Sequence, residues 1–176
     1  MAVFGSSQTR PGSKEWAEAE DAGRRIANAG LCVVTGGYGG TMEAVSLGAA
    51  GAGGHVVGVT APSLFARRAG ANPHVAREIE AVALTGRIGI LTELASGAMV
   101  LPGSIGTAAE LVIAWNINHI VRGNGGERLP TVAVGKVWRD LHELLVTAGG
   151  AAGEDIHLAD DSEGALTWLL SQPELN

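Results

Sequence analysis

The sequence predicts a doubly wound α/β fold, in which a mainly parallel sheet carries helices on both faces. First, short apolar runs with the length of buried strands alternate along the chain with longer segments of helical apolar spacing. Second, continuous apolar strands separated by helices are typical of parallel sheets, because the crossovers place helices on the two faces. The chain of 176 residues also suits a single core. We therefore expect one Rossmann-like domain over residues 1–176.

The elements can be placed in order from their composition. The expected strands are Ala2–Phe4, Leu31–Thr35, His55–Thr60, Ala98–Leu101 and Thr131–Val134, with Ile156–Leu158 as a candidate edge strand. The expected helices are Ser13–Ala29, Thr41–Ala50, Gly86–Ala95, Thr107–Val121, Trp138–Thr147 and Ser162–Leu170. The segment Ala61–Arg77 breaks the alternation with two prolines, Gly70 and the pair Arg67 and Arg68. We expect a functional loop there, over the carboxyl edge of the sheet.

The composition excludes several classes of protein. Hydrophobic residues make up 46% of the chain, which excludes a disordered chain. The formal net charge is −6, with 12 Lys and Arg against 18 Asp and Glu, so electrostatic binding to nucleic acid is not expected. No apolar run approaches the roughly 20 residues of a membrane span, and no signal peptide is recognisable. With a single cysteine, Cys32, the chain is expected in the reducing cytoplasm.

Glycine is the unusual residue, with 27 in the chain, and many glycines follow the expected strands. In doubly wound folds ligands bind outside the carboxyl ends of the strands. The first such loop is Gly5, Ser6 and Ser7, whose hydroxyl groups could donate to a phosphate or ribose. A strand exit that merely needs small residues explains this loop equally well.

The second loop lies between the strand at Leu31 and an alanine-rich helix. Its residues Gly36, Gly37, Gly39, Gly40 and Thr41 would leave backbone N–H groups free to face an anion at a helix N-terminus. It is neither a dinucleotide fingerprint nor a Walker A loop, since the required spacing and the Gly-Lys-Ser/Thr string are absent. A purely structural glycine turn remains the alternative.

The third loop follows the strand Ala98–Leu101 and is the most specific. Thr107 and Glu110 stand in the spacing of a capping box, which would make Glu110 a structural residue. The alternative is a carboxylate held at the mouth of an anion-binding loop. There it could act as a general base or stabilise an oxocarbenium ion. The sequence alone leaves both interpretations open.

These motifs resemble a known family. The string Pro102, Gly103, Ser104, Ile105, Gly106, Thr107 and Glu110 closely resembles the P-G-G-x-G-T-x-x-E motif of the LOG family, the cytokinin riboside 5′-monophosphate phosphoribohydrolases. Val3–Ser7 is similar to the opening strand and G-S-S turn of that family, and Gly36–Met42 to its second glycine loop. Arg87 stands 15 residues ahead of Pro102, as the family arginine does. The resemblance covers residues 1–135.

The resemblance implies a catalytic role for Glu110 with Arg87 as its partner, and phosphate contacts from Gly103, Gly106 and Thr107. Two positions depart from the family, since Ser104 replaces a glycine and Ile88 replaces the lysine of an Arg-Lys pair. Ser104 would either cost some backbone freedom or add a hydroxyl donor to the phosphate site. Members of the family are commonly dimers, so a homodimer or an assembly of dimers is expected.

The sequence thus favours an enzyme that cleaves the N-glycosidic bond of a nucleoside 5′-monophosphate, either AMP or N6-modified AMP, to free base and ribose 5-phosphate. The alternative is a non-catalytic carrier of a nucleotide or of the molybdenum cofactor, a pterin phosphate, because such carriers share the superfamily. No cofactor is expected. A pyridoxal phosphate decarboxylase is excluded because neither lysine, Lys14 or Lys136, lies in a suitable setting. No metal site is expected, since the five histidines are scattered.

Overall fold

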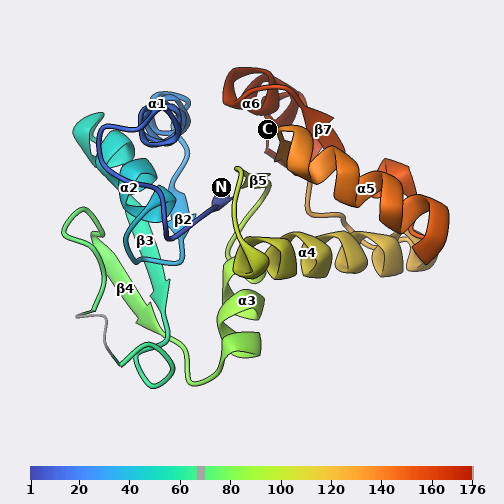
Figure 1. The fold of residues 1–176 in the computed structure, drawn as a ribbon, viewed down its shortest axis with the longest axis horizontal. Coiled ribbons are helices and arrows are strands. Elements are labelled where there is room, and N and C mark those ends of the chain that lie inside the picture. The colour runs from blue at the N-terminus through green and yellow to red at the C-terminus, as the bar shows by residue number, and fades with distance from the viewer. Residues whose placement is uncertain (67–69, 176) are drawn as a thin grey trace.

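The computed structural model describes residues 1–66 and 70–175. They contain one sheet of seven strands, all parallel, in the order β4-β3-β2-β1-β5-β6-β7 (Figure 1). The chain proceeds outward from β1 to β4 and then returns to place β5 on the other side of β1. The order of the strands therefore reverses at β1, where folds of this kind bind their ligands. The predicted doubly wound α/β fold is confirmed.

The strands and helices match the predicted ones closely. The strands are β1 Ala2–Phe4, β2 Val33–Thr35, β3 Val56–Thr60, β4 Arg77–Glu80, β5 Ala98–Val100, β6 Thr131–Val134 and β7 His157–Ala159. The helices are α1 Lys14–Asn28, α2 Thr41–Gly51, α3 Leu84–Glu93, α4 Ile105–Asn124, α5 Lys136–Gly149 and α6 Ser162–Leu170, with short 3-10 turns at Gly153–Asp155 and Pro173–Leu175. In the described part of the chain, no helix combines the length and the apolar character needed to cross a bilayer.

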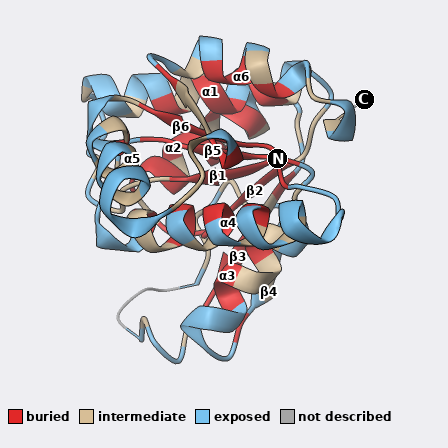
Figure 2. Ribbon diagram, turned by 90° about the vertical axis from the view of Figure 1, so that its right-hand side faces the viewer, coloured by how far each residue is buried: buried red, intermediate tan, exposed pale blue. Residues whose placement is uncertain are grey.

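The helices form a layer on each face of the sheet (Figures 1 and 2). Along each strand, alternate side chains point to opposite faces. On one face Val3 and Met99 pack against α1, α2 and α6, and on the other Phe4 and Val100 pack against α3, α4 and α5. Both clusters are almost entirely buried, as the red interior in Figure 2 shows. The strands β1, β2, β3, β5 and β6 are buried on both sides, which explains why their sequences are largely continuous apolar runs.

One predicted loop needs correction. Residues 61–76 connect β3 to β4, but Arg77, which we expected at the end of that loop, begins strand β4. The predicted residues Arg67 and Arg68 lie outside the described residues. Strand β4 was missed because its residues Arg77, Glu78, Ile79 and Glu80 are mostly charged and lie exposed at the edge of the sheet. Edge strands of this composition carry no apolar signal.

The β3–β4 connection is also unusual because its described residues form turns and bends rather than a helix. The segment passes across β3, where Ala76 N donates to Val56 O at 2.9 Å. It can come this close because Gly58 lies in the middle of β3. A Cβ at Gly58 would lie 3.0 Å from both the Cα of Gly37 and the side chain of Val75. A residue larger than glycine would push the returning segment off the sheet.

Helices α1 and α2 pack against each other through glycine. A Cβ added at Gly48 would lie 1.8 Å from Glu20 O, and one added at Gly23 would lie 2.0 Å from Val45 O. The two helix backbones therefore touch directly. This contact fixes the layer that supports the start of α2 and the glycine loop before it.

We expect Gly48→Ala to lower the free energy of unfolding by about 1–3 kcal/mol, because the methyl group must push the α1 backbone away. The matched control is Gly51→Ala in the same helix, where a Cβ meets nothing within 4 Å. The control should be neutral or stabilising by up to about 1 kcal/mol. Urea unfolding of both variants tests this, and equal stabilities would contradict the close contact.

Candidate functional site

Three loops meet at the carboxyl edge of the adjacent strands β2, β1 and β5. They are the residues after Phe4, after Thr35 and after Val100, the three loops that the sequence singles out. The first two are joined directly, since Thr41 N donates to Ser6 O at 2.8 Å. The hydroxyls of Thr9 and Thr41 also lie 2.8 Å apart. The structure therefore brings the predicted residues Ser6, Ser7 and Thr41 together.

The positions of the second loop are occupied by glycine for different structural reasons. Gly37 and Gly40 both have φ of 75°, a left-handed conformation that favours glycine. A Cβ at Gly40 would also lie 2.4 Å from Ser6 O, so this residue sets the contact between the first two loops. Gly39 is different, because its φ is not positive and its nearest contact would be Glu43 Oε2 at 3.6 Å. No described part of the protein requires glycine at position 39.

A buried ion pair lies beneath these loops. Arg87 Nη1 on α3 and Glu110 Oε1 on α4 are 3.3 Å apart, and their side chains are only 7% and 11% exposed. Arg87 also donates from Nε to Val59 O at 2.7 Å and from Nη2 to Gly36 O at 3.1 Å. The guanidinium thus joins the end of β3, the glycine loop and α4. The two residues predicted as a catalytic pair are in direct contact.

The position of Arg87 explains Gly36. A Cβ at Gly36 would lie 1.7 Å from Arg87 Nη2 and 2.6 Å from Met42 Sδ. This glycine therefore makes room for the arginine, whereas the sequence suggested a direct role toward a phosphate. Tyr38 covers the same guanidinium, with its ring centre 5.8 Å from Arg87 Cζ.

The environment of Glu110 makes it a candidate for proton transfer. Burial raises the pKa of its carboxyl to about 7, although the neighbouring Arg87 acts to lower it. A carboxyl group with this pKa is present in both charge forms near neutral pH. Strongly shifted groups of this kind are concentrated at functional sites, although buried structural ion pairs also produce them.

The capping-box interpretation of Thr107 and Glu110 is wrong. Helix α4 begins at Ile105 with Ser104 as its N-cap, so both residues lie further inside the helix than the prediction placed them. Thr107 is buried over Gly103, where a Cβ would lie 2.1 Å from Thr107 Oγ1. Glu110 points inward to Arg87 and caps nothing. Ser104 has φ of −102° and ψ of −167°, so serine stands there without backbone strain.

Gly106 lies in the first turn of α4, exposed to solvent. A Cβ at this position would meet nothing within 4 Å. Glycine within a helix is destabilising by roughly 0.5–1 kcal/mol relative to alanine. Gly106 and Gly39 are thus two glycines at the carboxyl edge of the sheet that leave space unused by the described residues.

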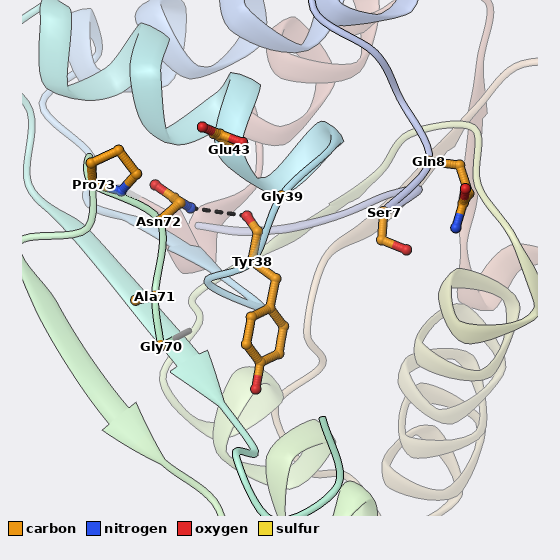
Figure 3. Close-up of a pocket in the computed structure, with 9 residues that line it drawn as sticks. All are labelled: Ser7, Gln8, Tyr38, Gly39, Glu43, Gly70, Ala71, Asn72 and Pro73. Atoms are coloured by element: carbon orange, nitrogen blue, oxygen red, sulfur yellow. Dashed lines mark hydrogen bonds between the residues drawn. The ribbon is translucent and has the colours of Figure 1, made fainter. Parts of the chain in front are cut away.

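Two cavities open beside the loops. The first, which we call the Tyr38 pocket, has a volume of about 360 Å³ and is lined by Ser7, Gln8, Tyr38, Gly39, Glu43 and 70–73 (Figure 3). The second, the Arg10 pocket, has a volume of about 440 Å³ and is lined by Ser6, Gln8, Thr9, Arg10, Ser13, Glu15 and 102–104. Gln8 belongs to both. Arg87 and Glu110 line neither pocket.

Several residues of these pockets were missed from the sequence. Asn72 binds the glycine loop, because its backbone N donates to Gly37 O at 2.7 Å and its Nδ2 to Tyr38 O at 3.0 Å (Figure 3). Nothing in the sequence of the 61–76 segment indicates these contacts. Tyr38, which lies among four glycines in the sequence, was also missed, and its hydroxyl accepts from Ala61 N at 2.8 Å.

Comparisons with known proteins place these features in a wider group. Residues 1–137 match the model of the SLOG cluster4 family. A molybdenum cofactor binding protein from the phototrophic bacterium Rippkaea orientalis is similar in structure, with a TM-score of 0.72 at 20% identity over 97% of this chain and 94% of that one. No curated protein matches the sequence.

Two further solved structures share the fold. The molybdenum cofactor carrier protein of Chlamydomonas reinhardtii has a TM-score of 0.68 at 22% identity, over 97% of this chain and 98% of that one. DNA processing protein A of Streptococcus pneumoniae has a TM-score of 0.54 at 16% identity, over 94% of this chain and 60% of that one. At these identities the likeness is one of fold.

The raised pKa of Glu110 predicts a pH-dependent loss of stability. Between about pH 4.5, the ordinary value, and about pH 7, the unfolded chain releases this proton while the folded chain keeps it. The free energy of unfolding should therefore fall as pH rises through this range, by an amount on the order of 3 kcal/mol. Urea unfolding at pH 4.5 and pH 8 checks this against Glu110→Gln, which lacks the titrating group. A wild-type slope equal to that of the variant would contradict the shift.

Proposed function

The chain belongs to the SLOG cluster4 family, and from this premise we propose that it hydrolyses the N-glycosidic bond of a nucleoside 5′-monophosphate. The observation that carries the proposal is the buried pair of Arg87 and Glu110 beneath the two glycine loops, with the pKa of Glu110 raised to about 7. A general base works best with a pKa near the working pH.

The proposed reaction follows from this geometry. The 5′-phosphate would lie against the N-terminus of α4, where Ser104, Gly106 and the free amides of the first turn face solvent. Ionised Glu110 would take a proton from water as the water oxygen bonds to C1′, and the bond from C1′ to the base would break. The proton taken up by Glu110 passes, directly or through solvent, to the leaving base, which restores ionised Glu110 and releases ribose 5-phosphate. Arg87 would hold Glu110 in place and offset the charge that develops.

The pair must be reached by the substrate for this to occur. Glu110 keeps 11% of its side chain exposed, so contact is confined to a narrow edge. Ile88, where the LOG family has lysine, is buried and offers no charge. Within the described residues, Arg87 is the one cation paired with Glu110. The phosphate charge would then be met chiefly by backbone amides rather than by a second side chain.

A carrier without catalysis is the second candidate. Two observations favour it, namely that Arg87 and Glu110 line neither pocket and that the similar solved structures include two proteins named for the molybdenum cofactor. Such a protein would use the same loops to hold a pterin phosphate and would release nothing from it. The buried ion pair would then be purely structural.

We expect purified protein to release free base and ribose 5-phosphate from at least one of AMP, GMP, CMP, UMP and N6-prenylated AMP, measured by liquid chromatography. Glu110→Gln should reduce release by at least about 100-fold, because the proton acceptor is lost. The matched control is Glu143→Gln on the exposed side of α5, which should keep full activity. If no base is released from any nucleotide, and the protein still binds one of them or a pterin phosphate, the result would favour the carrier.

A glycine exchange tests the phosphate site separately from the chemistry. Gly106→Ala should leave the melting temperature equal or higher, since alanine favours the helix, yet weaken AMP and GMP binding about tenfold or more by filling the space before the amides. Gly123→Ala, at the other end of α4, also meets nothing within 4 Å and should change stability alone. Calorimetric titration and thermal unfolding measure both effects. Unchanged affinity in Gly106→Ala would place the phosphate elsewhere.

A further inference from the structure

The two pockets differ in charge, and this difference assigns an orientation to the ligand. We propose that the Tyr38 pocket binds the heterocycle through the Glu43 carboxylate and selects rings that present a ring N–H next to an exocyclic amino group. Guanine and pterins share this edge. The phosphate then lies in the Arg10 pocket. This inference rests on the proposed function, from which it takes the phosphorylated ligand. It adds the class of heterocycle that the ligand carries.

The Tyr38 pocket holds a carboxylate whose charge no described residue compensates. Glu43 on α2 is partly buried, and no hydrogen bond or ion pair joins its carboxylate to any described side chain or backbone group. In Figure 3 its carboxylate lies beside Asn72 and close to Gly39, with Ser7 and Gln8 on the other side of the cavity. A bound phosphate would be repelled from this pocket. A group with N–H donors would be attracted.

The other polar groups of this pocket are largely committed. Asn72 uses its Nδ2 on Gly37 O and Tyr38 O, and its Oδ1 accepts from His74 N at 3.1 Å. The Tyr38 hydroxyl is bound to Ala61 N, and its ring is buried. Glu43 is therefore the strongest acceptor left for a ligand. Gly39 beside it leaves room for a flat ring, because only Glu43 Oε2 approaches a Cβ placed there.

The Arg10 pocket has the opposite character. It holds Arg10, the hydroxyl groups of Ser6 and Thr9, and Ser104 at the N-terminus of α4. Its one carboxylate, Glu15, is held by the first turn of α1, where hydrogen bonds from its own backbone N–H and from Ser13 lower its pKa. Amides at a helix start and an arginine favour an anion. Gln8 lines both pockets, so the two cavities adjoin, and the proposed nucleotide would extend from one to the other.

The chemistry of the ring edge gives the selectivity. A carboxylate accepts two hydrogen bonds side by side, which guanine and pterins supply from the ring N–H and the amino group. Adenine offers an amino group beside an unprotonated ring nitrogen, whose lone pair would face the second carboxylate oxygen. Inosine monophosphate retains the ring N–H and lacks the amino group. The expected order of affinity is therefore GMP above IMP above AMP.

An alternative role for Glu43 is structural, because an acidic residue in the first turn of α2 interacts favourably with the helix dipole. That role affects stability and leaves ligand preference unchanged. The two roles can be distinguished with Glu43→Gln. Glutamine keeps the shape and replaces one acceptor by a donor, which suits the edge of adenine.

The experiment is a calorimetric titration of the full chain with GMP, IMP, AMP and 6-hydroxymethylpterin phosphate, with base release measured on the same samples. Wild-type protein should bind GMP or the pterin phosphate about tenfold or more tightly than AMP. Glu43→Gln should abolish or invert this ratio, and Glu143→Gln should preserve it. Gly39→Ala places a methyl group in the pocket without backbone strain and should weaken binding of every ring while the protein stays folded.

The outcomes separate this inference from the hydrolase. Glu43-dependent binding of GMP or the pterin phosphate without base release supports the inference and refutes the hydrolase, and the tighter of the two ligands identifies the source of the ring. Base release combined with equal affinity for AMP and GMP, or with an unchanged ratio in Glu43→Gln, overturns the inference and leaves the hydrolase standing. Failure of both GMP and the pterin phosphate to bind also overturns it.

Discussion

The contact between Arg87 and Glu110 is the constraint on which the candidate site depends. One guanidinium, almost wholly buried, bonds to the end of β3, to the glycine loop after β2 and to the first half of α4. A buried charge without its partner is strongly destabilising, by roughly 3–5 kcal/mol. These three elements, far apart in the sequence, are therefore held in one relative position. Any chemistry at the carboxyl edge of the sheet takes place above this fixed pair.

The glycine loops are arranged around that pair rather than around a ligand alone. Gly36 is small because Arg87 occupies the space that a Cβ would need, and Gly103 is small because Thr107 packs over it. Gly39 and Gly106, in contrast, leave open space. A glycine-rich loop in this fold thus combines residues that the protein's own packing requires with residues that remain available to a ligand. Sequence alone does not separate the two kinds.

The sequence predicted the sheet well because nearly every strand is buried on both faces and reads as a short apolar run. The sequence did not predict β4, because three of its four residues are charged and lie at the exposed edge of the sheet. Such a segment resembles a loop. For the site, the resemblance to the LOG family paired Arg87 with Glu110, and the structure places the two side chains in contact, while their catalytic role remains a proposal. The capping-box alternative was wrong because the start of α4 is set by Ser104, three residues before Thr107. The sequence analysis did not identify three pocket residues, Asn72, Glu43 and Arg10. Their place beside the loops depends on how distant segments fold together, which the local sequence does not indicate.

The return from β3 to β4 contains no helix in its described residues, and this has an evolutionary consequence. A crossover helix would have to keep an apolar stripe facing the sheet. Packing against the core would therefore constrain its length and its sequence. Here the return contributes residues 70–73 to the wall of the Tyr38 pocket and then crosses β3 at Val75, over Gly58. Apart from Asn72, which binds the glycine loop, this wall can change in composition while the strands and the ion pair stay intact. The fold therefore keeps part of the pocket wall on a segment that can diverge separately from the core, while Glu43 stays on α2.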